Sequence, residues 1–181
     1  MKVLLGITGS VASTVAPKLV QALQAAGHEV QVVATKSSLY FFEEGDLGSV
    51  KLWKDSHEWP LDTYTRGQPI PHIDLGKWAD VLLIAPLSAN TLGKLANGLC
   101  DNLLTCVFRA WDLRKPVIFA PAMNTYMWRS PITRIQLDRF NAMTSIGFAL
   151  KVIDPVVKTL ACGDTGIGAM ADIDTIVKAV G

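Results

Sequence analysis

Short, uninterrupted apolar runs recur along the chain, separated by stretches in which apolar residues are spaced as on one face of a helix. Runs without polar alternation are typical of strands in a parallel sheet, because such strands are buried on both faces. Five segments carry such runs: residues 3–8, 29–35, 81–85, 117–120 and 149–153. We therefore predict five buried strands.

Helical spacing fills most of the chain between these runs. In the first such stretch, apolar residues recur from residue 11 to 23, Gly27 suits a C-cap, and Pro17 requires a kink or a start later than Ser10. Further helices are predicted over residues 39–44, 90–109, 133–145 and 172–180. Residues 45–71 are irregular and rich in proline, which predicts a long loop of the kind that often carries function. Strands that alternate with helices indicate an α/β fold with a doubly wound parallel sheet and right-handed crossovers.

Length and composition favour a single domain that spans residues 1–181. Half of the 181 residues are hydrophobic, enough to bury a sizeable core, and only 18% are charged. The formal net charge is +1, without runs of like charge, which argues against nucleic-acid binding as the main activity. The apolar runs are too short to cross a bilayer, so we expect no membrane association. The apolar stretch after Lys2 is broken by Gly6 and is better explained by a first strand than by a signal peptide.

Cysteine and histidine are scarce in this sequence. The three cysteines, Cys100, Cys106 and Cys162, fit a reducing compartment better than a disulfide framework, so we expect a cytoplasmic protein. No two of them have zinc-type spacing, and the chain has only three histidines, so we expect no metal site. The odd count leaves a thiol for chemistry.

Two motifs that follow strands suggest an anion site. Ligands of doubly wound sheets bind beyond the carboxyl ends of the strands. Residues 6–11 (Gly-Ile-Thr-Gly-Ser-Val) place backbone N–H groups and the Ser10 hydroxyl where a strand meets a helix. A tight turn with a helix cap explains this motif equally well, and the full G-x-G-x-x-G spacing is absent. Thr35-Lys36-Ser37 adds two hydroxyls and a cation at the same edge, so together the motifs favour a mononucleotide phosphate over a dinucleotide.

Small polar residues also follow the third and fourth strands. Residues 88–91 (Ser-Ala-Asn-Thr) can hydrogen-bond a heterocycle or a sugar chain, although a helix cap alone explains them better. In residues 121–128, helical spacing assigns the methionines and the tryptophan to the core. Asn124 is harder to explain in this way, because its amide suits a substrate carboxylate or amide.

A histidine and a cysteine complete the candidate residues. His72 follows the proline-rich segment and is suited to act as a base or to orient a carboxylate, although a structural histidine is the simpler explanation. In an extended segment, Asp74 would project from the same face as His72. Cys162 begins a stretch to residue 170 with three glycines in six positions, which predicts a mobile loop that closes over a site and a thiol that exchanges a proton.

Taken together, these motifs resemble those of the flavin-dependent cysteine decarboxylases. The motifs that carry the resemblance are residues 6–11, His72 with residues 78–80, residues 85–91, residues 121–128 and residues 161–164. The resemblance covers nearly the whole chain. It implies a Rossmann-like, flavodoxin-like fold, FMN as the cofactor, a small-molecule substrate, and a homotrimer with FMN near a subunit interface.

The resemblance also implies roles for individual residues. The residues that would hold or contact FMN are Gly9, Ser10, Val11, Ser37, Ser88, Ala89, Asn90, Thr91 and Ala122. His72 would be the catalytic histidine. Asn124 would bind the substrate carboxylate with support from Met127. Cys162 would donate a proton from the closing loop, where Ala161 and Gly163 flank it and contact the substrate.

Within this family, the resemblance is closest to the branch that converts 4'-phosphopantothenoylcysteine to 4'-phosphopantetheine in coenzyme A biosynthesis. The implied reaction is redox-neutral: the substrate thiol is oxidised to a thioaldehyde by FMN, CO2 leaves, and the enethiolate is reduced by the reduced cofactor with a proton from Cys162. The alternatives are a peptidyl-cysteine decarboxylase, a flavin prenyltransferase, a non-catalytic relative that regulates phosphatases, and a flavodoxin-like electron carrier. A prenyltransferase needs no thiol donor, a regulator typically has an acidic tail or lacks a catalytic residue, and a carrier needs no substrate-binding asparagine.

Overall fold

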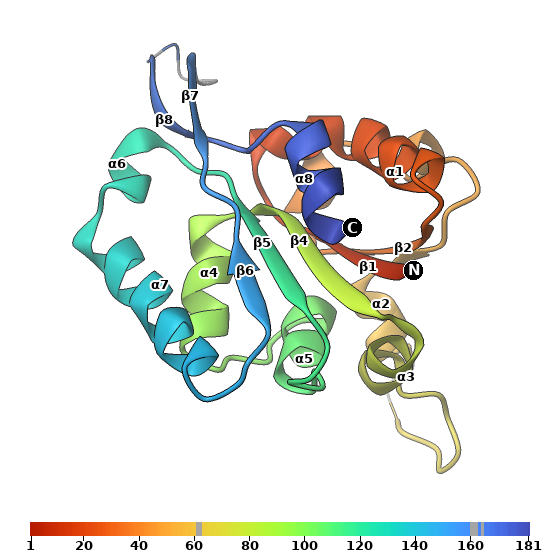
Figure 1. The fold of residues 1–181 in the computed structure, drawn as a ribbon. Helices are drawn as coiled ribbons and strands as arrows, with labels where there is room; N and C mark the ends of the chain where they lie inside the picture. The colour runs from red at the N-terminus through yellow and green to blue at the C-terminus, as the bar shows by residue number, and fades with distance from the viewer. Residues whose placement is uncertain (61–62, 160–162, 164) are drawn as a thin grey trace.

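A six-stranded parallel sheet forms the centre of the molecule (Figure 1). The computed structural model describes residues 1–60, 63–159, 163 and 165–181. The strands are β1 (Lys2–Ile7), β2 (Glu29–Ala34), β3 (Leu52–Trp53), β4 (Val81–Leu87), β5 (Val117–Pro121) and β6 (Leu150–Val152). Their order in the sheet is β3-β2-β1-β4-β5-β6. Successive strands are added toward one edge from β1 to β3 and toward the other edge from β4 to β6, so the order of the strands along the chain reverses between β1 and β4. This reversal point is where doubly wound sheets bind ligands.

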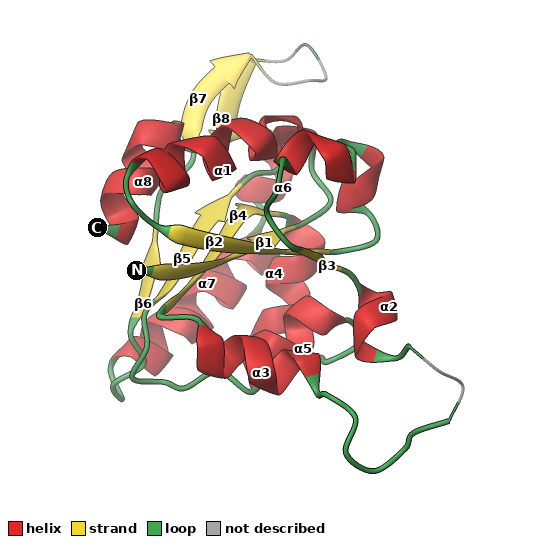
Figure 2. Ribbon diagram, turned by 90° about the vertical axis from the view of Figure 1, so that its right-hand side faces the viewer, coloured by secondary structure: helices red, strands yellow, loops and turns green. Residues whose placement is uncertain are grey.

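Helices cover both faces of this sheet (Figure 2). One face carries α1 (Ala16–Ala25) and α8 (Ile173–Val180), and the other carries α3 (Pro71–Trp78), α4 (Ala89–Ala96), α5 (Leu103–Arg109) and α7 (Pro131–Thr144). Side chains of β1 alternate between the two cores: Leu5 packs with the first group of helices and Leu4 with the second. All seven residues of β4 are buried, which explains its uninterrupted apolar run. The predicted α/β fold is therefore confirmed.

The start of the first helix agrees with the sequence. A short 3-10 helix (Val11–Val15) comes first, and α1 begins at Ala16, with Pro17 in its first turn. A proline is tolerated there because the first turn leaves its backbone N–H groups without helical partners. Gly27 follows the helix with a φ of 84°, the left-handed conformation expected of a C-cap glycine.

Three predicted elements differ from the structure. The predicted helix over residues 90–109 is two helices, α4 and α5. Gly98 (φ 69°) and the cap of Asn102, whose side chain accepts from the Thr105 N–H at 2.9 Å, separate them. Part of the predicted 45–71 loop is ordered as β3 and α2 (Asp55–Glu58). A two-residue edge strand has no periodicity that a sequence can reveal. Two 3-10 helices, Ser38–Tyr40 and Glu44–Leu47, replace the predicted helix over residues 39–44.

The expectations for His72 and for the glycine-rich segment are corrected in the same way. His72 and Asp74 lie on α3, not in an extended segment, so they do not share a face. Within the predicted loop of residues 161–170, residues 165–169 form a strand, β8 (Thr165–Ala169), which pairs with β7 (Val156–Thr159) in an antiparallel hairpin. Ala161 and Cys162 lie outside the described residues. A short helix, α6 (Thr125–Trp128), was not predicted.

The described residues contain neither a membrane-spanning helix nor a cluster of metal ligands. Among them, no helix is long and apolar enough to cross a membrane. The same residues contain no group of three or more histidine, cysteine or acidic side chains that could hold a metal ion.

Candidate functional site

A cavity of about 580 Å³ lies beyond the carboxyl ends of β1 and β5. Three segments form its walls: the turn after β1, the residues after β5, and the β7–β8 hairpin, which projects from the body of the molecule (Figure 1). The lining residues are Ser10, Val11, Ala12, Thr14, Ala122, Met123, Asn124, Lys158, Thr159, Gly168, Ala169 and Met170. Apolar atoms make up most of this lining, so the cavity suits a largely apolar ligand with a few polar anchors.

Glycines hold the hairpin against the rest of the site. The Met123 N–H donates a hydrogen bond to the Gly168 carbonyl at 2.9 Å. A Cβ at Gly168 would lie 2.2 Å from the Met123 carbonyl oxygen, and the φ of Gly168 is 141°. A Cβ at Gly166 would lie 2.3 Å from Thr125 Oγ1. The backbones therefore approach to a distance that only glycine permits.

Asn124 is held in place at the N-terminus of α6. Its side chain accepts a hydrogen bond from the Tyr126 N–H at 2.8 Å, and so it caps the helix. The same residue lines the cavity. Met127, the other predicted substrate residue on this segment, is 54% exposed and is not among the lining residues.

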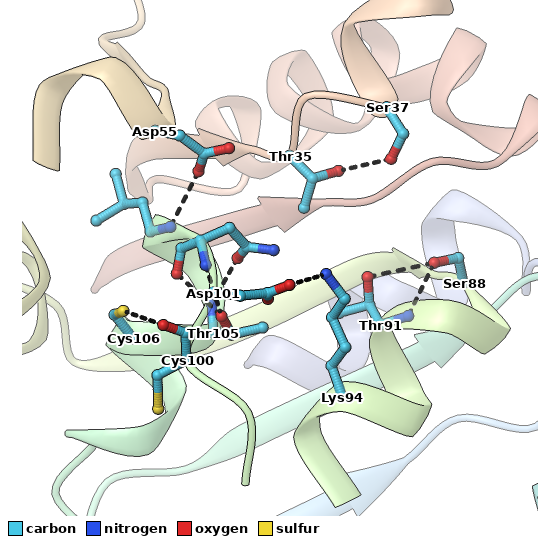
Figure 3. Close-up of polar contacts among 12 residues, drawn as sticks. Thr35, Ser37, Asp55, Ser88, Thr91, Lys94, Cys100, Asp101, Thr105 and Cys106 are labelled. Atoms are coloured by element: carbon cyan, nitrogen blue, oxygen red, sulfur yellow. Dashed lines mark hydrogen bonds and ion pairs between the residues drawn. The ribbon is translucent and has the colours of Figure 1, made fainter. Parts of the chain in front are cut away.

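A second, more polar cavity of about 490 Å³ lies beyond the end of β2, beside the first turn of α4 (Figure 3). Its lining residues are Thr35, Lys36, Ser37, Asp55, Asn90, Thr91, Lys94, Asp101 and Asn102. The hydroxyls of Thr35 and Ser37 are 3.3 Å apart, and Lys94 forms an ion pair with Asp101 at 2.5 Å. Hydroxyl, amide and ammonium groups are the donors that phosphate binds in proteins.

Gly9 connects the two cavities. It precedes Ser10, which lines the first cavity, and a Cβ at Gly9 would lie 2.4 Å from Oγ of Ser37, which lines the second. The predicted cofactor residues therefore divide between two adjacent cavities. Ser10, Val11 and Ala122 line the first, whereas Ser37, Asn90 and Thr91 line the second.

Ser88 and Ala89 are not among the residues that line either cavity. The Ser88 side chain accepts from the Thr91 N–H at 3.3 Å and caps α4, and the Ser88 N–H donates to Thr8 Oγ1 at 2.8 Å. This geometry supports the helix-cap interpretation of the serine. A flavin contact from Ser88 stays a prediction.

His72 lies apart from both cavities in this single chain. It sits in the first turn of α3, and its Nδ1 is 2.5 Å from Oε1 of Glu58. His72 is not among the described residues that line either cavity. Helices α3 and α6 are not adjacent in either view of the fold (Figures 1 and 2). The structure therefore does not bring His72 and Asn124 together within one subunit.

Comparison with known proteins adds independent information. A family model described as flavoprotein matches residues 1–181. The phosphopantothenoylcysteine decarboxylase of Mus musculus is 50% identical over 180 residues, which cover 99% of this chain and 85% of that protein. A solved cysteine-to-serine mutant of PPC decarboxylase, complexed with pantothenoylaminoethenethiol, has a TM-score of 0.91 at 47% identity, covering 99% of this chain and 95% of that one. The FMN binding protein AtHal3 has a TM-score of 0.86 at 48% identity, covering 99% and 94%.

This chain belongs to the flavoprotein family of cysteine decarboxylases. The resemblance seen in the motifs is therefore confirmed, together with the flavodoxin-like fold. FMN as the cofactor and carboxy-lyase as the enzyme class are confirmed as well. The roles assigned to single residues stay predictions.

The sequence analysis missed some residues that line the first cavity and one that contacts a predicted site residue. Lys158 and Thr159 line the first cavity from β7, and Glu58 holds His72 from α2. Thr159 lies within three positions of Cys162, so proximity to that motif was a usable signal. Glu58 precedes His72 by 14 positions, and no local pattern links the two.

Cys106, near the second cavity, is poorly suited to proton transfer. Burial, with smaller contributions from Cys100 and Glu58, raises the pKa of Cys106 to about 11. The Cys106 thiol donates to the Cys100 carbonyl at 3.4 Å (Figure 3). A thiol with such a pKa stays protonated and unreactive at neutral pH.

Proposed function

We propose that this chain decarboxylates 4'-phosphopantothenoylcysteine to 4'-phosphopantetheine, a step in coenzyme A biosynthesis, with FMN as its cofactor. The observation that supports this proposal is the set of residues that line the first cavity. Asn124 stands on one side of it, and Lys158 and Thr159, which lead into the segment with Cys162, stand on another. A carboxylate-binding amide and the flank of the proposed proton donor therefore face the same space.

The chemistry of the two cavities fits FMN. The second cavity offers the Ser37 hydroxyl, Asn90 and Thr91 as donors for the phosphate, beside the start of α4. Gly9 leaves room for close approach, because a Cβ there would meet Ser37. The first cavity offers the apolar walls that the isoalloxazine ring requires. When bound, FMN supplies the two-electron oxidation of the thiol and the return of those electrons.

The residues of the chain would bind the substrate, hold it in the reactive orientation and supply it with a proton. The side-chain N–H groups of Asn124 would donate hydrogen bonds to the substrate carboxylate and fix its orientation. The apolar lining of the cavity would exclude water and so favour the change from a charged carboxylate to neutral CO2. Cys162 would then donate its thiol proton to the carbon that is reduced.

The position of His72 supports a site shared between subunits. Because His72 is held on α3, away from the first cavity, we propose that the His72 of a neighbouring copy completes the site in a homotrimer. The exposed apolar side chains Tyr126, Ile132 and Ile135 on α6 and α7 offer a surface for such contact. We also propose a cytoplasmic location, which the three cysteines suggested.

Incubation of the purified, FMN-loaded protein with 4'-phosphopantothenoylcysteine tests the proposal, with mass spectrometry of the products. We expect loss of CO2 and formation of 4'-phosphopantetheine. The Cys162→Ser variant should still release CO2 and accumulate an oxidised product that lacks two hydrogens. The Asn124→Asp variant should bind FMN and lose turnover, because two carboxylates repel each other.

Three results would count against the proposal. Absence of product from the yellow protein would redirect it to a peptidyl-cysteine substrate or to a regulatory role. Ordinary product at the normal rate from Cys162→Ser would remove the proton-donor assignment. Full turnover by Asn124→Asp would remove the carboxylate assignment.

A further inference from the structure

Glu58 is a nearly buried carboxylate that lies outside both cavities. Only 7% of its side chain is exposed, compared with 26% for His72. It is the last residue of α2, the short helix that replaces part of the expected loop. A carboxylate so far removed from water requires compensating hydrogen bonds.

Both carboxylate oxygens of Glu58 contact His72. Oε1 lies 2.5 Å from Nδ1 of the ring, and Oε2 accepts from the backbone N–H of His72 at 3.0 Å. The two contacts fix both the start of α3 and the orientation of the ring. A single contact would leave the ring free to pivot.

The first contact also selects the tautomer of the ring. An ionised carboxylate has no proton to donate, so Nδ1 must carry the hydrogen in this pair. In the neutral imidazole, the lone pair then belongs to Nε2. Nε2 is therefore the nitrogen that faces away from Glu58 as an acceptor.

Helix α2 is itself anchored, so Glu58 is placed before any ligand arrives. Asp55, on the same helix, accepts the backbone N–H of Leu103 at 2.9 Å, which ties α2 to the start of α5. The Lys54 N–H donates to Nδ1 of His57 at 2.9 Å and closes the first turn of the helix. The carboxylate therefore reaches His72 from a rigid support.

We propose that Glu58 is the positioning residue of His72: it holds the ring in the Nδ1–H tautomer and presents Nε2 to the reaction. The inference rests on the proposed function only where it assigns His72 to catalysis. The contact and the tautomer are properties of the chain alone. In metal sites, loss of a carboxylate that orients a ligating histidine lowers activity by about 10- to 100-fold, and we expect a loss of similar size here.

The test combines nitrogen NMR of the His72 ring with steady-state kinetics. The His72 signals are assigned by comparison with His72→Gln. In the unsubstituted protein, we expect a protonated Nδ1 and an unprotonated Nε2 in the neutral ring. Glu58→Met removes both acceptors at similar length, so the Nδ1–H form should be lost and kcat should fall about 10- to 100-fold with little change in KM. Glu58→Gln keeps one acceptor oxygen, so its kcat should lie between those of Glu58→Met and the unsubstituted protein.

The matched control is Glu44→Gln. Glu44 is an exposed glutamate that pairs with Lys54 at 2.6 Å, and its replacement should leave the ring signals and kcat unchanged. A protonated Nε2 in the unsubstituted protein would overturn the inference without any variant, even if Glu58→Met fails to fold. An altered tautomer with unaltered kcat would overturn the positioning role. Failure of the proposed function is distinguishable, because it would remove turnover on this substrate and leave the NMR result intact.

Discussion

Replacing Gly168 with alanine should release the β7–β8 hairpin from the wall of the first cavity. Two features of the structure predict this. The φ of Gly168 is 141°, where side chains other than glycine are strained, and its Cβ would lie 2.2 Å from the Met123 carbonyl oxygen. The second contact is with backbone, so no change of rotamer can relieve it.

The expected cost can be worked out from these two features. Strain at such a φ amounts to about 1–3 kcal/mol. Movement of the hairpin by about 1 Å also breaks the hydrogen bond from the Met123 N–H to the Gly168 carbonyl, worth about 0.5–1.5 kcal/mol. The sum is roughly 1.5–4.5 kcal/mol, which corresponds to a factor of about 10 to 2000 in a local opening equilibrium.

Hydrogen exchange of the Met123 amide measures this opening directly. We expect its exchange to become about 10- to 2000-fold faster in Gly168→Ala, and product formation to fall with it. Gly163→Ala is the matched control, because Gly163 also has a positive φ (90°) but a Cβ there would meet nothing within 4 Å. Equal exchange rates at Met123 in the two variants, or a change below about threefold in Gly168→Ala, would refute the reasoning.

Three further predictions concern other parts of the chain. Gly9→Ala places a methyl group 2.4 Å from Ser37 Oγ, so FMN fluorescence titration should show about 10- to 100-fold weaker binding; unchanged affinity would separate Gly9 from the cofactor site. Burial and the nearby N-terminus lower the pKa of His28, so its neutral form stabilises the fold and stability should decline as pH falls below about 6.5. Urea unfolding of His28→Leu should show a shallower decline, and an identical slope would contradict this. With a pKa of about 11 against an ordinary 9.0, Cys106 should react with iodoacetamide at pH 8 about 100-fold more slowly than an exposed thiol, which peptide mapping can check.

The fold could be predicted wherever the signal was local. The apolar runs of β1, β2, β4 and β5 identified the strands, because burial on both faces leaves a continuous pattern in the sequence. The break between α4 and α5 could not be predicted in this way. It depends on the backbone of Gly98 and on the cap of Asn102, which an apolar pattern that continues through both helices conceals.

In the candidate site too, residues with a local sequence signal were predicted and residues without one were missed. Ser10 and Asn124 were found because each follows a strand of a parallel sheet, and the ends of such strands meet at one edge. Ala122 was assigned only through the family resemblance. Lys158 was missed, because its place in the cavity depends on a hairpin held by backbone contacts from another part of the chain. Residues of that kind have no spacing rule.

The sequence by itself determined five of the six strands of the central sheet and the motifs that connect this chain to its family, because periodicity and strand-end chemistry are properties of neighbouring residues. Through that resemblance, it also indicated the cofactor. Only the tertiary structure decided which of those residues share a space. The approach of Gly9 to Ser37, of Gly168 to Met123 and of Glu58 to His72 joins atoms that are distant in the chain. Such contacts exist only once the layers have packed, because close packing, and not local conformation, sets which side chains and backbones meet.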